Sequence, residues 1–457
     1  MRILFLQKDV FGRPSIMLLS AILKRAGYRC NVLVDDLETN MIKKALKLDP
    51  DVIAFSITSG EHEWMNNIGY EIRKKFRKKI ICGGPHPTFY PEIINEEYLD
   101  AICIGEGERA ILNFVSALEN KEDITTIKNM YVKKDGKLYK NDVDPDLQDL
   151  NLNPFPDKSI YDIYGFHRDL RNPVTGKNLF QAGRGCAFKC TFCFNKKYNK
   201  IYNGKSKVMR RKKVEKIIEE ILIVKRKYPK MEFILFSDDY FTSPPRKWIF
   251  DFLDQYKEKI NLPFMIQTRA DSLDEILIAR LKEANCFSIK LGVESGNDYI
   301  RNKILKKSVS KRKLLNAAFL MKKYGIHLHT LNMFGNPRES LEKAFDTFEL
   351  NKRMNPTFAW CSLLNPFPGT DIYEYALKNN FLENNSSKPL YTYSMFKNSP
   401  LKLKDKNKIY NLQKIFGFAV FLRLPKKIVK FLTSFNSKKS LFLWAHFMDA
   451  HWPYNPP

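Results

Sequence analysis

The sequence predicts an α/β protein with two strand–helix domains and a mostly helical C-terminal region. Short apolar runs alternate with amphipathic stretches over residues 1–120, the same alternation resumes after residue 176, and it is lost after residue 375. The length of 457 residues agrees with two or three domains. We therefore expect domains over 1–143 and 176–375, a linker over 144–175 and a helical region over 376–457.

Five short apolar runs predict the strands of the first domain, and helical patterns such as 15–26 and 64–76 separate them. Because runs buried on both faces with helices between them are typical of a doubly wound, Rossmann-like sheet, we expect these strands to be parallel. Such a sheet binds ligands at the carboxyl ends of its strands. The predicted strands are Ile3–Leu6, Cys30–Val34, Val52–Phe55, Ile80–Cys82 and Ala101–Ile104.

Polar and glycine-rich loops follow these strands at 7–12, 56–60, 83–87 and 105–108. Each loop alone is a weak signal, because glycine-rich turns after strands are common. His86 could lie near a ligand, and a solvated turn histidine is the alternative. The candidate ligand-binding residues of these loops are Ser56, Thr58, Gly83, Gly84, His86, Gly105 and Glu106.

The pattern changes after residue 120. Met130–Val132 and Lys137–Tyr139, on either side of Asp135-Gly136, predict a β-hairpin with a tight turn. Asp144–Asp157 is rich in Asp, Asn and Pro and has no periodicity, which predicts the interdomain linker.

The second domain contains six predicted strand–helix units, which are too few for a closed eight-fold barrel. In barrel folds the chemistry lies on the loops at the carboxyl ends of the strands. The predicted strands are Asn178–Ala182, Phe233–Phe236, Phe264–Thr268, Phe287–Leu291, His327–Phe334 and Thr357–Leu363.

Three cysteines lie in one short loop after the first of these strands: Cys186, Cys190 and Cys193. Their thiolates can converge on one inorganic centre, and the nearby lysines favour the thiolate form. Ordinary iron–sulfur proteins offer four cysteines, so three would leave one iron open to a non-protein ligand. A zinc knuckle or three buried free thiols are the alternatives, although no nearby His or Cys completes a four-ligand zinc site.

The Cys-x3-Cys-x2-Cys spacing, with Phe192 before the last cysteine, resembles the cluster loop of the radical S-adenosylmethionine (SAM) enzymes. The resemblance implies a partial (β/α)6 TIM-type barrel and a 4Fe-4S cluster held by these three catalytic cysteines. It also implies that SAM chelates the open iron and is cleaved to a 5′-deoxyadenosyl radical. The electron would come from an external donor of the flavodoxin or ferredoxin type.

Motifs at later strand ends resemble the SAM-binding motifs of the same family. The resemblance implies that Asp238 lies beside the SAM amino group, and a helix cap is its alternative role. It implies that Arg269 faces the SAM carboxylate and Glu294 the ribose hydroxyls, and an ion pair between these two residues is the alternative. Ser295 belongs to the motif of Glu294, and Gly335 begins a turn that resembles the one near the adenine.

Gly83–Thr88, followed about twenty residues later by Gly105–Glu108, resembles the cobalamin-binding domain attached to many radical SAM enzymes. The best-known cobalamin domains carry Asp-x-His-x-x-Gly after the first strand, whereas this chain has no His before His62. If cobalamin binds, we therefore expect no histidine of that loop on its lower face. A domain that has lost the cofactor and serves as a scaffold is the alternative.

Composition limits the other possibilities. The net charge of +27 fits nucleic acid, an anionic membrane surface or a lysine-rich organism, and the scattering of the lysines favours the last. Eight cysteines without a disulfide-like pattern indicate a reducing cytoplasm. Residues 415–432 mix apolar and basic side chains, so this segment could lie on a membrane surface or pack across the barrel mouth and shape the substrate pocket.

The predicted function is that of a cobalamin-dependent radical SAM methyltransferase that acts on an unactivated carbon of a small molecule or lipid. A radical SAM cyclase, a carbon–carbon coupling enzyme or another oxidoreductase that does not use cobalamin is the alternative. A tRNA methylthiotransferase fits the charge, but its relatives carry a second set of three cysteines that this chain does not show. An RNA- or membrane-binding module would leave the cysteine loop unexplained.

Overall fold

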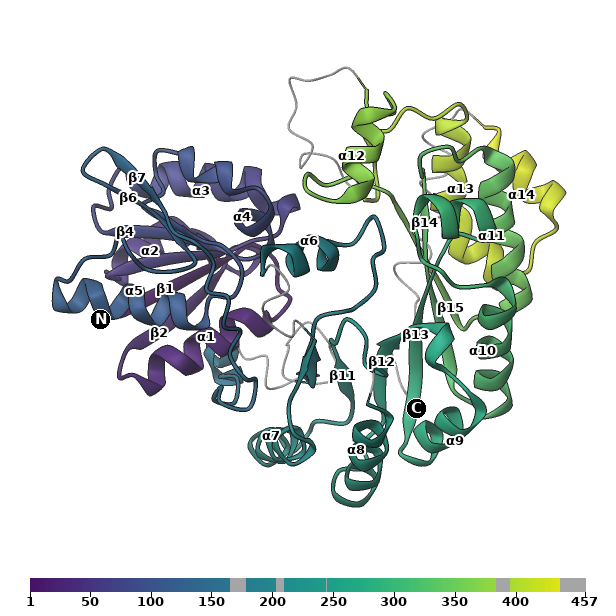
Figure 1. Ribbon diagram of the computed structural model, residues 1–457, viewed down its shortest axis with the longest axis horizontal. Helices are drawn as coiled ribbons and strands as arrows, with labels where there is room; N and C mark the ends of the chain where they lie inside the picture. The colour runs from purple at the N-terminus through teal and green to yellow at the C-terminus, as the bar shows by residue number, and fades with distance from the viewer. Residues whose placement is uncertain (165–177, 203–208, 244, 384–394, 436–457) are drawn as a thin grey trace. The chain divides into compact units, whose positions relative to one another are not determined.

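The computed structural model describes residues 1–164, 178–202, 209–243, 245–383 and 395–435. The chain divides into two compact units, Met1–Arg184 with Lys197–Glu232 and Gly185–Lys196 with Phe233–Pro457 (Figure 1). This division by packing differs from the predicted boundary at residue 176. Residues 178–184 and helix α7 (Val214–Lys227) belong to the first unit, and the cysteine loop belongs to the second.

The first unit contains a seven-stranded sheet in the order β2-β1-β3-β4-β5-β6-β7. The strands β1 to β5 are parallel, which confirms the predicted doubly wound sheet, and the predicted hairpin forms the antiparallel edge β6–β7. The bounds are β1 Arg2–Gln7, β2 Arg29–Val34, β3 Val52–Ser56, β4 Lys79–Gly83, β5 Ala101–Cys103, β6 Met130–Lys134 and β7 Lys137–Lys140.

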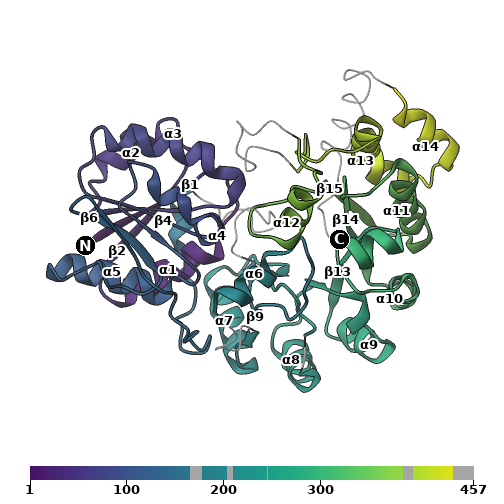
Figure 2. The same ribbon diagram turned by 45° about the horizontal axis from the view of Figure 1, so that its top comes forward.

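Helices cover both faces of this sheet. Helices α1 (Pro14–Arg25) and α5 (Glu108–Asn120) lie on one face, and α2 (Met41–Lys47) and α3 (His62–Arg73) lie on the other (Figure 2). Successive strand residues alternate between the two cores: Phe5 packs with the α1–α5 layer and Leu4 with the α2–α3 layer. A sheet of this type binds ligands at the carboxyl ends of its strands, where α4 (Pro85–Phe89) follows β4.

The described part of the predicted linker packs against the first unit. A 3-10 helix runs over Lys158–Tyr164, and the fully buried Tyr161 donates a hydrogen bond of 2.6 Å to Gln7 Oε1 of β1. The ammonium of Lys216 on α7 donates to the carbonyl oxygens of Asn151 and Asn153, at 2.6 Å each. Within the predicted linker, residues 158–164 thus form a helical turn that the buried Tyr161 anchors to the first unit.

The second unit contains parallel strands in the order β15-β14-β13-β12-β11. Helices α8 (Arg246–Lys259), α9 (Glu275–Glu283), α10 (Lys311–Lys323) and α11 (Leu341–Met354) lie along the outside of this sheet (Figure 2). The predicted strand at 178–182 is present as β8 (Leu179–Phe180) and belongs to the first unit. The other bounds are β11 Ile234–Phe236, β12 Phe264–Thr268, β13 Cys286–Glu294, β14 His327–Phe334 and β15 Phe358–Leu363.

The C-terminal region is helical, as predicted, with α12 (Asp371–Lys378), α13 (Lys406–Phe421) and α14 (Lys426–Thr433). Phe416 of α13 shares a core with Phe348 of α11 and Ala359 of β15. Helix α13 thus extends the outer helical layer, and it does not cross the barrel mouth, which was one of the two placements considered for this segment. Within the described ranges, we found no helix with the length and apolar character required to cross a membrane.

Candidate functional site

A cavity of about 370 Å³ lies within the first unit at the carboxyl ends of β3, β4 and β5. Thr88 and Phe89 of α4 form part of its wall. Three lining residues that the sequence did not single out, Gln181, Arg184 and Tyr198, come from distant segments of the chain. The predicted residues that line the cavity are Ser56, Gly83, Gly84, Gly105 and Glu106.

Two of the lining glycines have conformations that other residues rarely adopt. Gly84 has a φ of 103°, and a Cβ atom there would lie 2.7 Å from the carbonyl oxygen of Ile57. Gly105 has a φ of 79°, and a Cβ atom there would collide with the hydroxyl of Tyr202. Thr88 joins the two loops, because its hydroxyl donates to Gly84 O (2.8 Å) and accepts from Gly105 N–H (3.0 Å). Glycine at these positions lets two loops meet at the cavity without side chains.

A partly buried group of charged side chains forms one side of the cavity. Arg184 Nη1 lies 2.5 Å from Glu108 Oε1 and 3.1 Å from Glu106 Oε1, and Arg210 also pairs with Glu106. Although burial raises the pKa of Glu106, the charges of Arg184 and Arg210 lower it below its ordinary value. Glu106 and Glu108 together hold Arg184 at the cavity wall.

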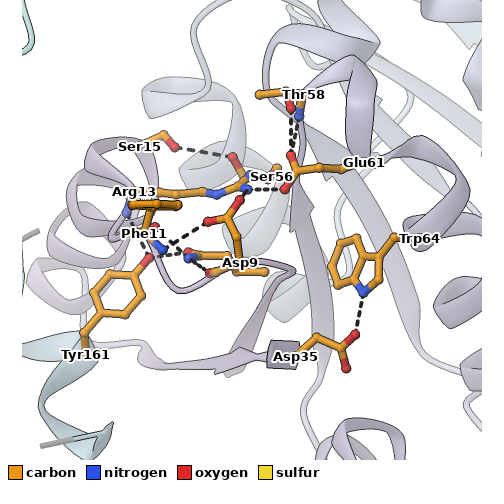
Figure 3. A network of polar contacts seen from close by, with 11 residues as sticks. Asp9, Phe11, Arg13, Ser15, Asp35, Ser56, Thr58, Glu61, Trp64 and Tyr161 are labelled. Carbon is orange, nitrogen blue, oxygen red and sulfur yellow. Dashed lines mark hydrogen bonds and ion pairs between the residues drawn. The ribbon is translucent and has the colours of Figure 1, made fainter. Parts of the chain in front are cut away.

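A second polar network fixes the ends of β1 and β3 beside the cavity (Figure 3). The guanidinium of Arg13 donates to the Ser56 carbonyl and pairs with Asp9 (2.9 Å) and with Glu61. Glu61 in turn accepts a hydrogen bond of 2.7 Å from the Thr58 N–H. Thr58, predicted to bind a cofactor, thus belongs to this network and is not among the residues that line the cavity.

His86 is buried, so the alternative of a solvated turn histidine is wrong. Its Nδ1 lies 3.1 Å from Ser59 Oγ, and its ring centroid lies 4.9 Å from that of His62. The short helix α4 turns the side chain away from solvent, and burial lowers its pKa to about 3. His86 is not one of the lining residues of the cavity.

In the second unit, contacts on both sides of Cys190 fix the cysteine loop. Thr191 N–H donates to Leu305 O (3.0 Å), and its hydroxyl donates to Ile304 O (2.8 Å). At the start of the loop, Gly185 N–H donates to Asp239 Oδ2 at 3.2 Å. Burial raises the pKa of all three cysteine thiols, to about 11 for Cys193. The hydrogen bonds of Thr191 and Gly185 therefore fix the backbone of the loop.

Arg269 lies directly against this loop. Its guanidinium carbon lies 3.4 Å from the ring centroid of Phe188, and Nη1 lies 4.0 Å from Cys190 Sγ. Asp271 accepts two hydrogen bonds of 2.9 Å from the same guanidinium. This fork-to-fork pair fixes the orientation of the guanidinium beside the thiol.

Glu294 pairs with Lys307, whose Nζ lies 2.9 Å from Glu294 Oε1. Glu294 has a φ of 63° at the end of β13, and the pair leaves no room for a side chain at Gly292. Since Arg269 is held by Asp271, the alternative of an ion pair between Arg269 and Glu294 is wrong. Lys307 was not predicted from the sequence, because only the fold brings it to the end of β13.

The remaining predicted residues of the second unit are buried. Ser295 has no exposed surface, and its hydroxyl accepts from Asn297 N–H (3.2 Å), so its side chain supports the turn after Glu294. Asp238 is also buried, after β11. Gly335 has a φ of 77° and precedes the turn in which Glu339 Oε2 accepts from Asn336 N–H at 3.0 Å.

No three His, Cys, Asp or Glu side chains in the described ranges are arranged around a single metal-ion position. The assignment of the three cysteines to a cluster therefore stays a prediction from their spacing and surroundings.

Comparison with known proteins matches two segments of the chain to protein families. Residues 180–350 match the radical SAM superfamily, and residues 12–115 match the B12 binding domain. An uncharacterized methyltransferase of Pyrococcus horikoshii is 28% identical over 356 residues, which are 77% of this chain and 74% of the relative. An anaerobic magnesium-protoporphyrin IX monomethyl ester cyclase of Rubrivivax gelatinosus is 26% identical over 373 residues, 78% of this chain and 64% of the relative.

Solved structures share the fold across most of the chain. The cobalamin-dependent S-adenosylmethionine radical enzyme OxsB with aqua-cobalamin bound superposes with a TM-score of 0.73 at 16% identity, covering 98% of this chain and 75% of that chain. The radical SAM methyltransferase TsrM of Kitasatospora setae, with cobalamin and a 4Fe-4S cluster bound, gives a TM-score of 0.65 at 15% identity, covering 84% and 76%. The likeness confirms the predicted α/β architecture.

Proposed function

Because the chain belongs to the radical SAM superfamily, in the class with a B12 binding domain, we propose that it is a cobalamin-dependent methyltransferase acting on an unactivated carbon. When bound, the cluster supplies the electron that cleaves SAM and cobalamin carries the methyl group. The cavity at the strand ends of the B12-binding region, with its two loops meeting at Thr88, is the observation that carries this proposal.

Cys186, Cys190 and Cys193 would hold the cluster. Thiolates are the ligands that iron–sulfur clusters take, and the positive charges of Arg269 and Lys307 near Cys190 offset the charge of an anionic centre. Burial raises the pKa of the three thiols, so assembly of a cluster on their thiolate forms would release protons. The donor set and its surroundings therefore fit the cluster.

The SAM contacts would come from the charged groups around the loop. Glu294 offers a carboxylate for the ribose hydroxyls, and Lys307 beside it offers an ammonium for a carboxylate. Arg269 would face the SAM carboxylate, and Asp271 would orient its guanidinium. Ser295, Asp238 and Gly335, which are also predicted SAM-site residues, are buried and would act mainly through their backbone groups.

Cobalamin would lie against the cavity of the first unit, where Ser56, Gly83, Gly84, Gly105 and Glu106 would hold it. The glycine backbones permit close approach, and the fixed Arg184 adds hydrogen-bond donors to the wall. These residues fit a large ligand that carries polar groups along its edge. His86 and Thr58 contact other side chains, so we do not propose either as a ligand of the cofactor.

Anaerobic reconstitution with iron, sulfide, cobalamin and SAM tests the proposal. Radical enzymes of this superfamily need an external electron donor, and we propose a flavodoxin or ferredoxin in that role. We expect the intact chain to form 5′-deoxyadenosine from SAM, and Cys190→Ala to form none. Cys30→Ala, which removes a buried thiol on β2, is the matched control and should keep the activity. Continued cleavage by Cys190→Ala would refute the assignment.

Oxidative cyclisation is a second candidate, favoured by the 26% identity to the Rubrivivax gelatinosus cyclase. The two functions differ in what happens to SAM. A methyltransferase also produces S-adenosylhomocysteine in a reaction that requires cobalamin, whereas a cyclase that uses no methyl group produces none. The nucleoside products of the reconstituted protein therefore separate the two candidates.

A further inference from the structure

One face of the sheet in the second unit carries a lysine and a histidine side by side. Lys290 of β13 is in register with His329 of β14, and His329 is in register with Phe358 of β15. On the other side, Lys290 is in register with Gln267 of β12. Because residues in register project from the same face, these four side chains form one row across the sheet.

This row lies on the face opposite the outer helices. The hydroxyl of Thr330, next to His329 on β14, donates to Asn351 Oδ1 of α11 at 2.6 Å, so Thr330 faces the helices. On β15, Ala359 packs in the core with α13. Since successive side chains alternate, His329, Phe358 and Trp360 project from the inner face, and Lys290 projects with them.

Among the described residues, none forms an ion pair with Lys290 or a hydrogen bond with His329 Nδ1. The ammonium of Lys290 has no ion pair or hydrogen bond there, and His329 Nδ1 is buried without a hydrogen-bond partner. Gln267 is neutral, and Glu294, further along the same face of β13, is held by Lys307. Burial lowers the pKa of Lys290, and burial together with the Lys290 charge lowers that of His329 to about 4. A half-buried cation without a counter-ion is costly, and an anion would remove that cost.

We infer, on the basis of the proposed function, that this inner face binds an anionic group of the substrate, a carboxylate or a phosphate. Lys290 supplies the counter-ion and His329 a hydrogen bond. Trp360 lies on the neighbouring strand β15 and is 40% exposed, so it supplies an apolar surface for the body of the substrate.

The position of the row also constrains the substrate. Lys290 lies four residues before Glu294 on β13, which corresponds to roughly 13 Å along a strand. Because Glu294 and the cysteine loop lie at the carboxyl ends of the strands, the reacting carbon is remote from the anionic group. The substrate class is thus an apolar molecule with its anion far from the methylated carbon.

Binding of three matched probes to the reconstituted full-length protein tests this inference by calorimetry. The probes are 1-naphthylacetate, 1-naphthyl phosphate and the neutral 1-naphthylacetamide. We expect the intact protein to bind at least one anion about tenfold more tightly than the amide, and Lys290→Met to abolish that preference. The anion whose affinity falls more between the intact protein and Lys290→Met identifies the substrate group as a carboxylate or a phosphate.

Matched variants keep the test decisive. Lys290→Arg retains the charge and should retain the preference, and so should Lys322→Met, which removes an exposed lysine of α10. His329→Gln should reduce anion affinity and leave amide affinity unchanged, which tests the site even if Lys290→Met fails to fold. Equal binding of all probes by the intact protein, or an unchanged preference in a folded Lys290→Met or His329→Gln, overturns the inference. The binding test measures no turnover, so its result does not depend on whether the protein transfers a methyl group.

Discussion

Gly84→Ala is expected to disturb the B12-binding unit more than any ordinary glycine substitution. Gly84 combines a φ of 103° with a ψ of −171°, a region that is essentially restricted to glycine and costs other residues about 1–3 kcal/mol. The new Cβ atom would also lie 2.7 Å from the Ile57 carbonyl oxygen and 3.0 Å from its nitrogen, so the backbone must move. We expect the free energy of unfolding of the first unit to fall by about 3 kcal/mol.

Gly136→Ala is the matched control. Gly136 has a φ of 72° in the β6–β7 turn, and nothing lies within 4 Å of a Cβ atom built there. Only the left-handed conformation is penalised, by about 1 kcal/mol. Urea denaturation, monitored by hydrogen exchange in peptides from β3 and β4, measures the stability of the first unit separately. Visible absorbance measures cobalamin binding. A Gly84→Ala protein as stable as Gly136→Ala, with unchanged cobalamin affinity, would refute the reasoning.

Three further substitutions test the charged groups. Arg184→Met should lower the free energy of unfolding of the first unit by about 3–5 kcal/mol at pH 7. The loss should shrink below pH 4.5, because Arg184 lowers the pKa of Glu106 and that contribution disappears as the carboxylate is protonated. Glu339→Gln should flatten the pH dependence of unfolding measured at pH 5 and pH 8. Burial raises the Glu339 pKa from 4.5 to about 7, so the intact protein should lose about 3 kcal/mol as pH rises through this range, and an equal slope in both proteins would contradict this. Lys307→Met should reduce the rate of SAM cleavage more than about tenfold at unchanged iron content, whereas Lys306→Met, at the exposed neighbouring position, should not. Equal rates of SAM cleavage in the two variants would show that Lys307 is not part of the site.

The strands were predictable because each one is a run of apolar residues buried on both sides. Ile53 and Phe55 of β3 pack on one face of the sheet and Ala54 on the other, so the whole run is apolar. The strand ends therefore located the loops of the cavity. The C-terminal region was correctly predicted to be helical, but the face on which α13 packs depends on its tertiary partners.

The partners of the site residues could not be predicted in the same way. Arg184 reaches Glu108 from 76 positions away in the chain, and no local pattern marks that contact. Lys307 reaches Glu294 only because the segment after β13 folds back over Gly292. His86 follows a glycine pair typical of a solvated turn, yet α4 buries it. Buried ion pairs and buried histidines are tertiary effects, and a single sequence gives no signal for them.

The most direct test of the central claim is the cofactor content of the anaerobically reconstituted protein, measured together with the products of SAM. We predict cobalamin and a 4Fe-4S cluster in equal amounts, with both 5′-deoxyadenosine and S-adenosylhomocysteine formed. A protein that binds the cluster and cleaves SAM but retains no cobalamin and forms no S-adenosylhomocysteine would contradict the account.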